Sequence, residues 1–330
     1  MIEAILQLLN PIAAYGVPVM IVLMLVALGG LFSERSGVVN IALEGIMVMG
    51  GFVGAMVIYY MTVTHDYPLQ LAVVFGLISG AVAGMVFSLA HAFASVTMNS
   101  NQIISATALN LFAPAISVFT ARTFYINPAT RQATDKIIIS ASYRLNIPFL
   151  QHIPVLGRFL FTNAFLSTFI GLGVLVVVTI VFKKTRLGLR IQSCGENPHA
   201  ADSLGINVYK VRYIGILLSG LLAGLGGATY LISFHNGFDG TVHGLGFLSL
   251  AILISGQWKP VRVFVFAVVF AFMYVIQSQY DSLALFRNLT LPRQIYQMMP
   301  YVMTLVILAI FSKESQAPKA IGEPYDASKR

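Results

Sequence analysis

From Gly45 to Ala121 the chain contains no Asp, Glu, Lys or Arg other than Asp66. A water-soluble domain carries charged side chains over much of its surface, so this long stretch cannot be the outside of such a domain. The whole composition agrees, because 57% of the residues are hydrophobic, only 10% are charged, and the mean hydropathy is +0.82. The sequence therefore predicts an all-α polytopic membrane protein.

Eight apolar runs are each long enough, at about 20 residues, to cross a bilayer as a helix. They are 15–33, 41–61, 70–92, 101–121, 163–182, 213–234, 261–280 and 297–312. A ninth run, 247–256, is about half a span. It either crosses together with the glycines before it or re-enters the protein as a broken helix. We expect about nine to ten transmembrane helices, some of them broken or re-entrant.

Basic residues predict which helix ends face the cytoplasm. Segment 183–212 carries six Lys or Arg residues close to helix ends, and the positive-inside bias makes it cytoplasmic. If the short run crosses, the turn at 257–262, the turn at 33–37 and the tail fall on the same side. Segment 122–160 is then external, and the N-terminus is outside. We expect a transmembrane domain, 1–312, which includes the cytoplasmic loop 183–212, and a cytoplasmic tail, 313–330.

Three charged residues near the start, Glu34, Arg35 and Glu44, stand among apolar residues. A turn follows Arg35, so Glu34 and Arg35 are expected to reach the membrane surface or to pair with each other. Glu44 has no such escape, and a charge at the bilayer centre costs roughly 2.5–3.5 kcal/mol. We expect it to point inward beside Asn40, bonded across helices or protonated. Their spacing of four predicts that Asn40 and Glu44 share a helix face.

Polar side chains on apolar helices usually face protein or water rather than lipid. They are therefore candidates for the transport path, together with one aromatic ring that can stack on a base. The candidates are Asn40, Glu44, Asn101, Gln102, Asn110 and Phe247. The alternative for the amides is that they cap helices or join one helix to another.

Two Gly-xxx-Gly pairs predict close contacts between helices. One pair is Gly80 with Gly84, and the other is Gly220 with Gly224. Small residues at this spacing let two helix backbones approach each other where no hydrophobic force acts between helices.

No pattern for covalent chemistry is present in the sequence. It has neither the phosphate loop G-x-x-x-x-G-K-[ST] nor HExxH, its six histidines are scattered, and Cys194 is its one cysteine. We therefore predict no catalytic residues, no metal site and no cofactor on this chain. The basic residues that give the net charge of +8 cluster in short loops beside apolar runs. This placement favours a role in membrane orientation over nucleic-acid binding. Transport is the expected function.

The cytoplasmic loop contains a predicted short helix. Asn197 before Pro198 suits a helix start with Asn197 as N-cap, and Gly205 suits its end. Such a helix on the membrane surface fits a coupling role, in which a separate ATPase pushes on it; the alternative is an ordinary solvated connector. The residues expected to form the coupling segment are Gly195, Glu196, Asn197, Pro198, Ala200, Ala201 and Gly205.

Four further stretches carry a family resemblance. RLGLRIQSCGENPHAADSLGINVYKVRYIGILLSGLLAGLGGATY (186–230) resembles the coupling loop and following helix of permeases in the branched-chain amino acid and simple-sugar ABC importer superfamily. SERSGVVNIALEGIMVMGG (33–51), GLGFLSLAILISGQWKP (244–260), and LPRQIYQMMPYVMTLVILAIF (291–311) with APKAIGEPY (317–325) are similar to nucleoside permeases of the NupQ kind.

The resemblance implies an ABC importer permease fold in a bacterial plasma (inner) membrane, with both termini inside, unlike the orientation derived above. It implies four partners besides membrane lipid: a second homologous permease subunit, a cytoplasmic ABC ATPase that binds ATP and Mg²⁺, a substrate-binding lipoprotein, and a nucleoside as cargo. Nucleic acid is not among them. Alternative cargoes for the same architecture are a simple sugar, a branched-chain amino acid or a vitamin. The alternative class is a stand-alone secondary carrier.

Overall fold

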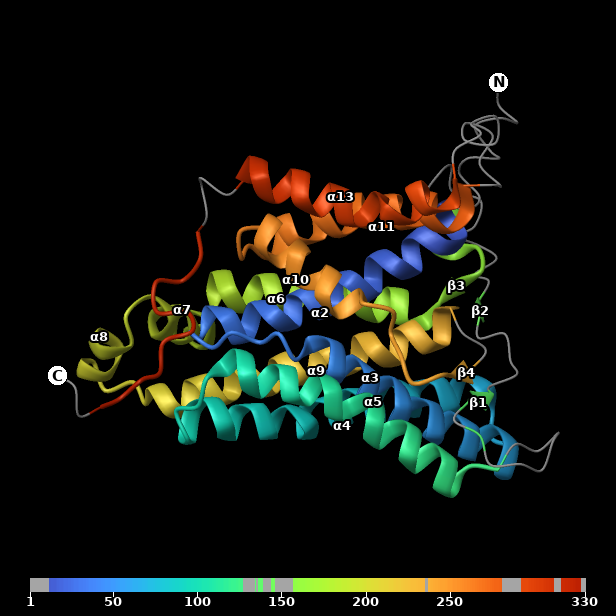
Figure 1. The fold of residues 1–330 in the computed structure, drawn as a ribbon, viewed down its shortest axis with the longest axis horizontal. Helices are drawn as coiled ribbons and strands as arrows, with labels where there is room; N and C mark the ends of the chain where they lie inside the picture. Colours follow the sequence, from blue (N-terminus) through green and yellow to red (C-terminus); the bar gives the residue numbers. More distant parts are fainter. Residues whose placement is uncertain are drawn as a thin grey trace.

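The computed structural model describes residues 12–126, 134, 136–138, 144–145, 157–234, 237–280, 292–311 and 316–327. Long helices run roughly side by side along the longest axis of the molecule (Figure 1). They are α2 (Val17–Arg35), α3 (Leu43–Tyr59), α4 (Leu69–Ala92), α5 (Gln102–Phe124), α6 (Leu166–Lys184), α9 (Val208–Phe234), α11 (Pro260–Gln279) and α13 (Arg293–Phe311). Each of the eight predicted apolar runs overlaps one of these helices, so the prediction that the runs are helical is confirmed.

Shorter elements complete the described chain. Single π-helical turns are η1 (Ile12–Gly16), η2 (Tyr60–Thr64), η3 (Phe93–Thr97) and η5 (Gly157–Phe161), and the short helices are α7 (Arg186–Glu196), α8 (Pro198–Ser203) and α10 (Leu245–Ser255). Two antiparallel pairs of strands join β1 (Ile137–Ile138) to β4 (Gly237–Phe238) and β2 (Arg144–Leu145) to β3 (Ala164–Phe165). The strands lie at the opposite end of the molecule from α7 and α8 (Figure 1).

Seven helices of the described residues are long and apolar enough to span a membrane, and α10 is a shorter apolar helix. The helix α13 packs beside α11 and is not among these seven. The expected total of nine to ten spans, and the side on which the N-terminus lies, depend on residues 1–11 and 281–291, which lie outside the described residues.

Helices α3, α4 and α9 cross at backbone contact. A Cβ added to Gly224 would lie 2.3 Å from the carbonyl oxygen of Gly80, and one added to Gly84 would lie 2.4 Å from that of Gly220. Helix α3 joins through Gly50, where a Cβ would lie 2.3 Å from the Gly224 oxygen. The two predicted Gly-xxx-Gly pairs therefore do mediate a close approach, and they pack on each other. We call these five residues the glycine crossing.

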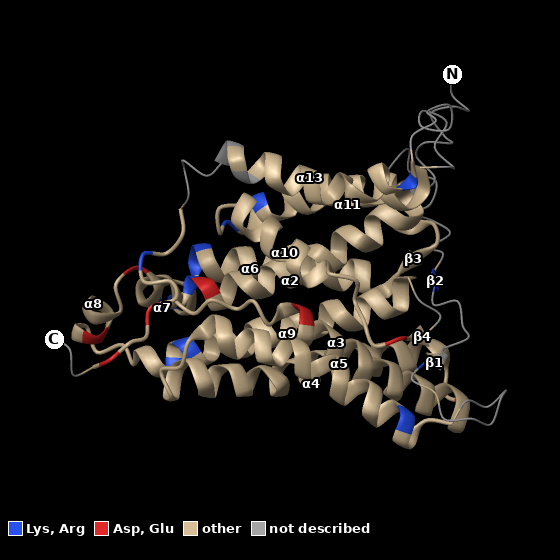
Figure 2. Cartoon of the chain, viewed as in Figure 1, with Lys and Arg blue, Asp and Glu red and all other residues tan. Residues whose placement is uncertain are grey.

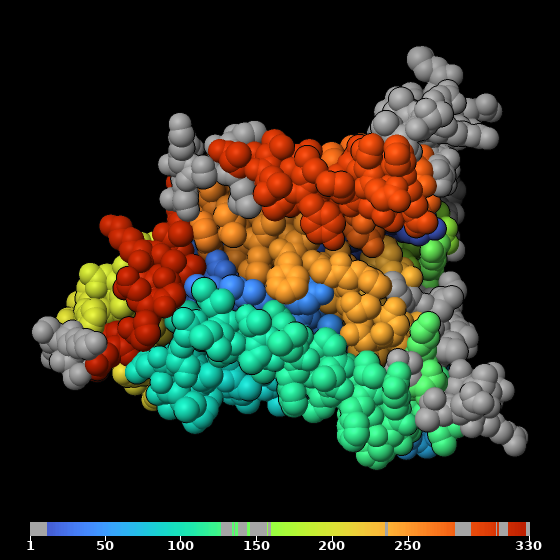
Figure 3. Space-filling view, in the orientation of Figure 1, coloured from blue at the N-terminus to red at the C-terminus, as the bar shows by residue number. Residues whose placement is uncertain are grey.

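Helix α2 lies at the centre of the bundle. All of its residues from Pro18 to Glu34 except Met20 are buried. In Figure 3 the blue of α2 and α3 is visible mainly as a narrow strip between the other helices. Because α2 is apolar around its circumference from Pro18 to Phe32, other helices can surround it without burying unpaired polar side chains.

One end of the bundle collects most of the described charges, around α7, α8 and the C-terminal segment (Figure 2). Arg35 Nη2 donates to the Trp258 carbonyl at 3.1 Å, and the Ala320 N–H donates to the Gly195 carbonyl at 2.9 Å. The turn at 33–37, the loop 183–212, the turn at 257–262 and the tail therefore meet at one end. This common end agrees with their predicted placement on one side of the membrane, and which side that is stays a prediction.

Candidate functional site

Helix α8 has the termini that the sequence predicted. Asn197 precedes it in an extended conformation, its Oδ1 accepts the Ala200 N–H at 3.0 Å, and Pro198 occupies the first helical position. Beyond the helix, Gly205 has φ of 78° and its N–H donates to the Asp202 carbonyl at 2.8 Å. This left-handed conformation is one that glycine adopts without a steric penalty. The helix therefore starts and stops through its own local chemistry.

The seven predicted coupling residues divide by exposure. Gly195, Pro198 and Ala201 are buried, whereas Glu196, Asn197, Ala200 and Gly205 are exposed. Gly195 faces inward, because a Cβ added there would lie 2.2 Å from the Arg35 carbonyl oxygen. A bulky residue at Gly195 would thus disturb the packing of the chain itself. The outward surface of this corner is formed by the exposed members of the set.

Leu204, directly after α8, was missed by the sequence analysis. Its side chain is 82% exposed in a region rich in polar residues. Its position beside the glycine that ends α8 was the available signal, because binding residues are often found in loops.

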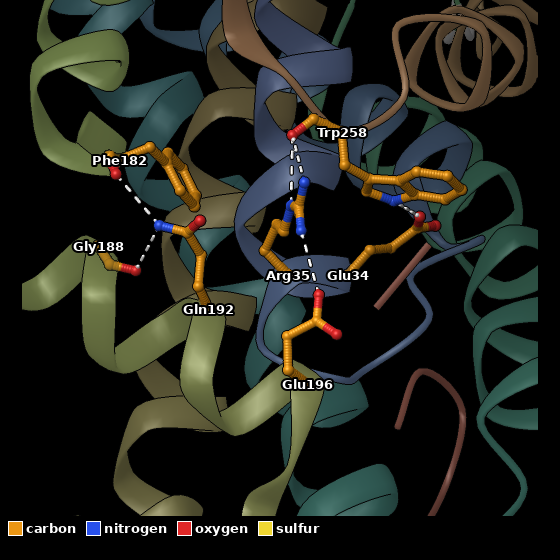
Figure 4. A network of polar contacts seen from close by, with 7 residues as sticks. All are labelled: Glu34, Arg35, Phe182, Gly188, Gln192, Glu196 and Trp258. Atoms are coloured by element: carbon orange, nitrogen blue, oxygen red, sulfur yellow. Dashed lines mark hydrogen bonds and ion pairs between the residues drawn. The ribbon is translucent and has the colours of Figure 1, made fainter. Parts of the chain in front are cut away.

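Two neighbouring charged residues of α2 bind the turn that follows α10 (Figure 4). Glu34 is 5% exposed and accepts the Trp258 indole N–H at 2.6 Å. Arg35 donates from Nε and Nη2 to the Trp258 carbonyl at 3.2 and 3.1 Å, and its Nη1 lies 3.5 Å from the Glu196 carboxylate. Glu34 and Arg35 do not pair with each other, whereas Arg35 does reach the charged end of the bundle, where it meets the half-exposed Glu196. Consecutive helix residues point in different directions, so each finds its own partner.

The turn after α10 has an unusual backbone. Gln257 and Trp258 both have φ of 51°, in the left-handed region. For residues other than glycine this conformation costs on the order of 1–3 kcal/mol each. The bonds from Arg35 and Glu34 to Trp258, and a hydrogen bond from Arg262 to Gln257, stabilise the turn. The strained backbone therefore lies at the point where α2 contacts the end of α10.

Glu44 binds the other end of α10. Its two carboxylate oxygens accept the N–H groups of Gly244 at 2.8 Å and Gly246 at 2.7 Å. The first turn of a helix leaves N–H groups unpaired, and hydrocarbon offers no water to bind them. Because Glu44 also lies in the first turn of α3, its charge is stabilised by the N-terminal ends of two helices. The expectation that Glu44 is bonded across helices is confirmed.

Three side chains thus bind both ends of α10. We call Glu34, Arg35 and Glu44 the α10 clamp. All three come from α2 or the start of α3, about 200 positions or more from their partners.

Asn40 does not share a helix face with Glu44, because α3 begins only at Leu43. The predicted helical spacing therefore does not apply across residues 36–42. Asn40 is fully buried, donates from Nδ2 to the Ser219 hydroxyl at 2.9 Å, and accepts the Ala42 N–H at 3.2 Å. It joins the irregular segment to α9.

The other amides satisfy this irregular backbone. Gln102 accepts the Val39 N–H at 2.7 Å, and Asn110 accepts the Gly45 N–H at 2.8 Å while donating to the Ile41 carbonyl at 3.0 Å. Non-helical backbone within a membrane requires such partners. The alternative, that amides join helices, therefore describes these contacts.

The last two candidates differ from one another. Asn101 is the N-cap of α5, where it accepts the N–H groups of Ile103 and Ile104. Phe247 lies on α10 with 49% of its surface exposed.

A residue that the sequence analysis missed is His91. It is fully buried, and its Nε2 lies 2.9 Å from the Val39 carbonyl oxygen. No sequence motif marks it.

The C-terminal segment 316–327 packs over the same end. Arg212 of α9 is almost fully buried, donates to the Glu323 carbonyl at 2.8 Å, and has its guanidinium 6.0 Å from the centre of the Tyr325 ring. Close by, burial raises the pKa of the Cys194 thiol, so the neutral form is favoured there.

Comparisons with known proteins agree with this architecture. Residues 12–308 match the family described as branched-chain amino acid transport system, permease component. The nucleoside ABC transporter permease protein NupC of Lactococcus lactis is 39% identical, over 93% of this chain and 94% of its own length. The guanosine ABC transporter permease protein NupQ of Bacillus subtilis is 38% identical over the same shares. A putative glucose ABC transporter permease protein, TsgC13 of Haloferax volcanii, is 30% identical over 92% of this chain and 94% of its length.

No solved structure matches the chain. The family match covers nearly all of the described bundle, and the apolar helices and the relatives point the same way. The chain therefore belongs to the permease family of branched-chain amino acid transport systems, and it is a multi-pass bacterial membrane protein that serves as the permease subunit of an ABC importer.

Proposed function

We propose that the cargo of this importer is a nucleoside. The observation that carries the proposal is the similarity to two permeases named for nucleosides or guanosine, at 39% and 38% identity over 93% of the chain. A sugar is the second candidate, because a relative at 30% identity is named for glucose. The identity is higher to the nucleoside permeases at equal coverage of their lengths, which favours a nucleoside.

A second, related permease subunit covers the exposed side of α10 in this proposal. The helix has 11 residues and is thus about 16 Å long, roughly half of a hydrocarbon core. Its cytoplasmic end meets Arg35, so its first turn lies at about mid-depth. Phe247 and Ile254 are nonetheless exposed on this chain. Irregular backbone at this depth is not tolerated against lipid, so a partner subunit or a water-filled path must cover it.

A separate cytoplasmic ATPase binds the corner of α7 and α8 in this proposal. The exposed residues Ala200 and Leu204 form the contact, and the Glu196 carboxylate, with its side chain 45% exposed, lies between this surface and Arg35. A shift of α8 therefore acts through Arg35 on the Trp258 carbonyl and on the end of α10. This chain supplies no catalytic group; ATP and Mg²⁺ bind to the ATPase, and a lipoprotein delivers the cargo.

The proposal is tested in a bacterial strain that lacks nucleoside uptake. The permease, its partner permease, the ATPase and the lipoprotein are expressed together, and uptake of labelled guanosine and labelled glucose is measured with and without an ATPase-inactivating mutation. We expect ATP-dependent guanosine uptake. Glucose uptake without guanosine uptake would contradict the nucleoside assignment. Uptake by this chain alone, driven by an ion gradient, would contradict the ABC mechanism.

A further inference from the structure

A cavity of about 300 Å³ lies between the start of α10 and the helices α11 and α13. Its lining includes His243 and Gly244 before α10, Tyr274 and Gln277 of α11, and Tyr301 of α13. A Cβ added to Gly244 would lie 3.9 Å from the Tyr301 hydroxyl, so this ring reaches the N-terminal end of α10. The cavity therefore adjoins the end of α10 that Glu44 binds.

The polarity of this cavity separates it from two larger hollows of the described chain. Hollows of about 410 and 490 Å³ are lined by apolar side chains, such as Met20 and Phe272 in one and Val177 and Leu221 in the other. Apolar hollows of this kind suit lipid chains or neighbouring helices. A cavity lined largely by polar groups at the same depth suits water or a water-soluble molecule, because polar groups against lipid are costly.

The lining groups define the chemistry of a ligand. Tyr274 and Tyr301 both line the cavity, and each brings an aromatic ring that can stack and a hydroxyl. Within the described residues, the Gln277 amide makes no hydrogen bond, so its donor and its acceptor are both available. An amide that donates and accepts side by side matches the edge of a nucleobase, and aromatic rings stack on its face.

The charged residues around the cavity disfavour ligands with a negative charge. No Lys or Arg is among the described residues that line this cavity, whereas the Glu44 carboxylate lies behind the Gly244 N–H, and Asp239 lies 3.9 Å from His243. A phosphate group would therefore find no Lys or Arg to bind in the described lining, and two carboxylates stand close behind it. The volume and lining suit an uncharged heterocycle with a sugar attached better than a nucleotide.

We propose that this cavity is a weak nucleoside-binding site of the permease, in which the base stacks on Tyr274 or Tyr301 and hydrogen-bonds to Gln277. The inference rests on the proposed nucleoside cargo and adds the place and the residues of recognition. The site borders the first turn of α10, so a shift of α10 would alter it directly.

The test uses the complete permease–ATPase complex in lipid nanodiscs, without the lipoprotein. Weak binding is measured by saturation-transfer-difference NMR with guanosine, guanosine monophosphate and glucose as probes. We expect a signal from the base proton of guanosine and about a tenfold weaker signal from the other two probes. Gln277→Leu and Tyr301→Leu should reduce the guanosine signal about tenfold, and Tyr301→Phe should retain most of it.

Gln279→Leu is the matched control, because Gln279 also lies on α11 but does not line the cavity. Equal signals from Gln277→Leu and Gln279→Leu would overturn the inference, as would a glucose signal stronger than that of guanosine. Guanosine uptake is measured in the same variants with the lipoprotein present. If the wild-type transporter imports guanosine but the cavity variants bind it normally, only the inference fails. If the wild type imports no guanosine, the proposed function itself fails.

Discussion

The glycine crossing and the α10 clamp join helices in opposite ways. At the crossing, α3, α4 and α9 touch largely through backbone atoms, and the side chains that enter the contact, Ser88 and Ala228, are small. At the clamp, three long polar side chains reach from α2 and α3 to the two ends of a half-length helix. Backbone contacts of this kind cannot shift without a clash, whereas hydrogen bonds can exchange partners. The comparison identifies a fixed part of the bundle and a part suited to move.

Breaking the crossing should have the largest effect. Gly224→Ala adds a Cβ at 2.3 Å from the Gly80 oxygen, and its three nearest atoms are all backbone atoms of α4, so no flexible side chain can yield. We expect a loss of about 3 kcal/mol or more of folding free energy and little protein in the membrane. Thermal unfolding in detergent and the amount of membrane-inserted protein measure it.

The control for this substitution is Gly173→Ala on α6, where an added Cβ meets nothing within 4 Å. It should leave stability unchanged or raise it slightly, since alanine favours a helix. Equal behaviour of the two variants would show that the crossing is not closely packed.

Removing the cap at the start of α10 should have the next largest effect. Glu44→Ala leaves the Gly244 and Gly246 N–H groups without their acceptors, and Glu44→Gln leaves a weaker, uncharged one. We expect a loss of about 1–3 kcal/mol for alanine and less for glutamine, with the protein still inserted but guanosine uptake strongly reduced. Thermal unfolding and uptake in the same membranes measure both. If Glu44→Ala showed wild-type guanosine uptake, the α10 clamp would have no role in the transport cycle.

Changing the cytoplasmic end of the clamp should cost less stability. Glu196→Gln removes a half-exposed ion pair with Arg35, which is worth at most about 1 kcal/mol. Coupling should suffer more, so we expect ATP hydrolysis to continue while guanosine uptake falls. The ratio of guanosine transported to ATP hydrolysed in proteoliposomes reports this. A ratio equal to that of the wild type would show that Glu196 does not transmit the motion.

The smallest effect on stability is expected at Leu204. Its side chain is 82% exposed, so Leu204→Ser should change the free energy of unfolding by less than about 0.5 kcal/mol. If the ATPase docks there, the variant should bind it several-fold more weakly. Co-purification with the ATPase measures this, and unchanged binding would place the docking surface elsewhere.

Local features of the fold were predictable from the sequence, because they depend on neighbouring residues. The eight apolar runs, the Asn197 cap and the glycine pairs each follow from spacing within one helix or turn. The placement of basic residues also predicted that four segments lie on the same side of the membrane: the turn at 33–37, the loop 183–212, the turn at 257–262 and the tail.

The contacts of the clamp were not predictable in the same way. Trp258 binds Glu34 across 224 positions, and no periodicity reports such a pairing. The prediction that Asn40 and Glu44 share a helix face was wrong, because α3 begins three residues after Asn40, at Leu43. The charge on Glu44 correctly indicated an inward-facing role, but only the position of α10 shows that the role is to cap a broken helix.

The central claim is that α10 moves during the ATP cycle while the glycine crossing stays fixed. Spin labels on Val82 of α4 and Ile254 of α10 report whether α10 moves, and labels on Val82 and Ile214 of α9 report whether the crossing stays fixed. All three residues are exposed on this chain alone, so the labels are attached before the chain is assembled with its partner subunit and the ATPase. The native Cys194 is buried with a raised pKa and should label slowly. Pulsed electron spin resonance on the complete transporter, with and without ATP, should show a changed distance for the α4–α10 pair and an unchanged one for the α4–α9 pair. An unchanged α4–α10 distance, or an equal change in both pairs, would contradict the account.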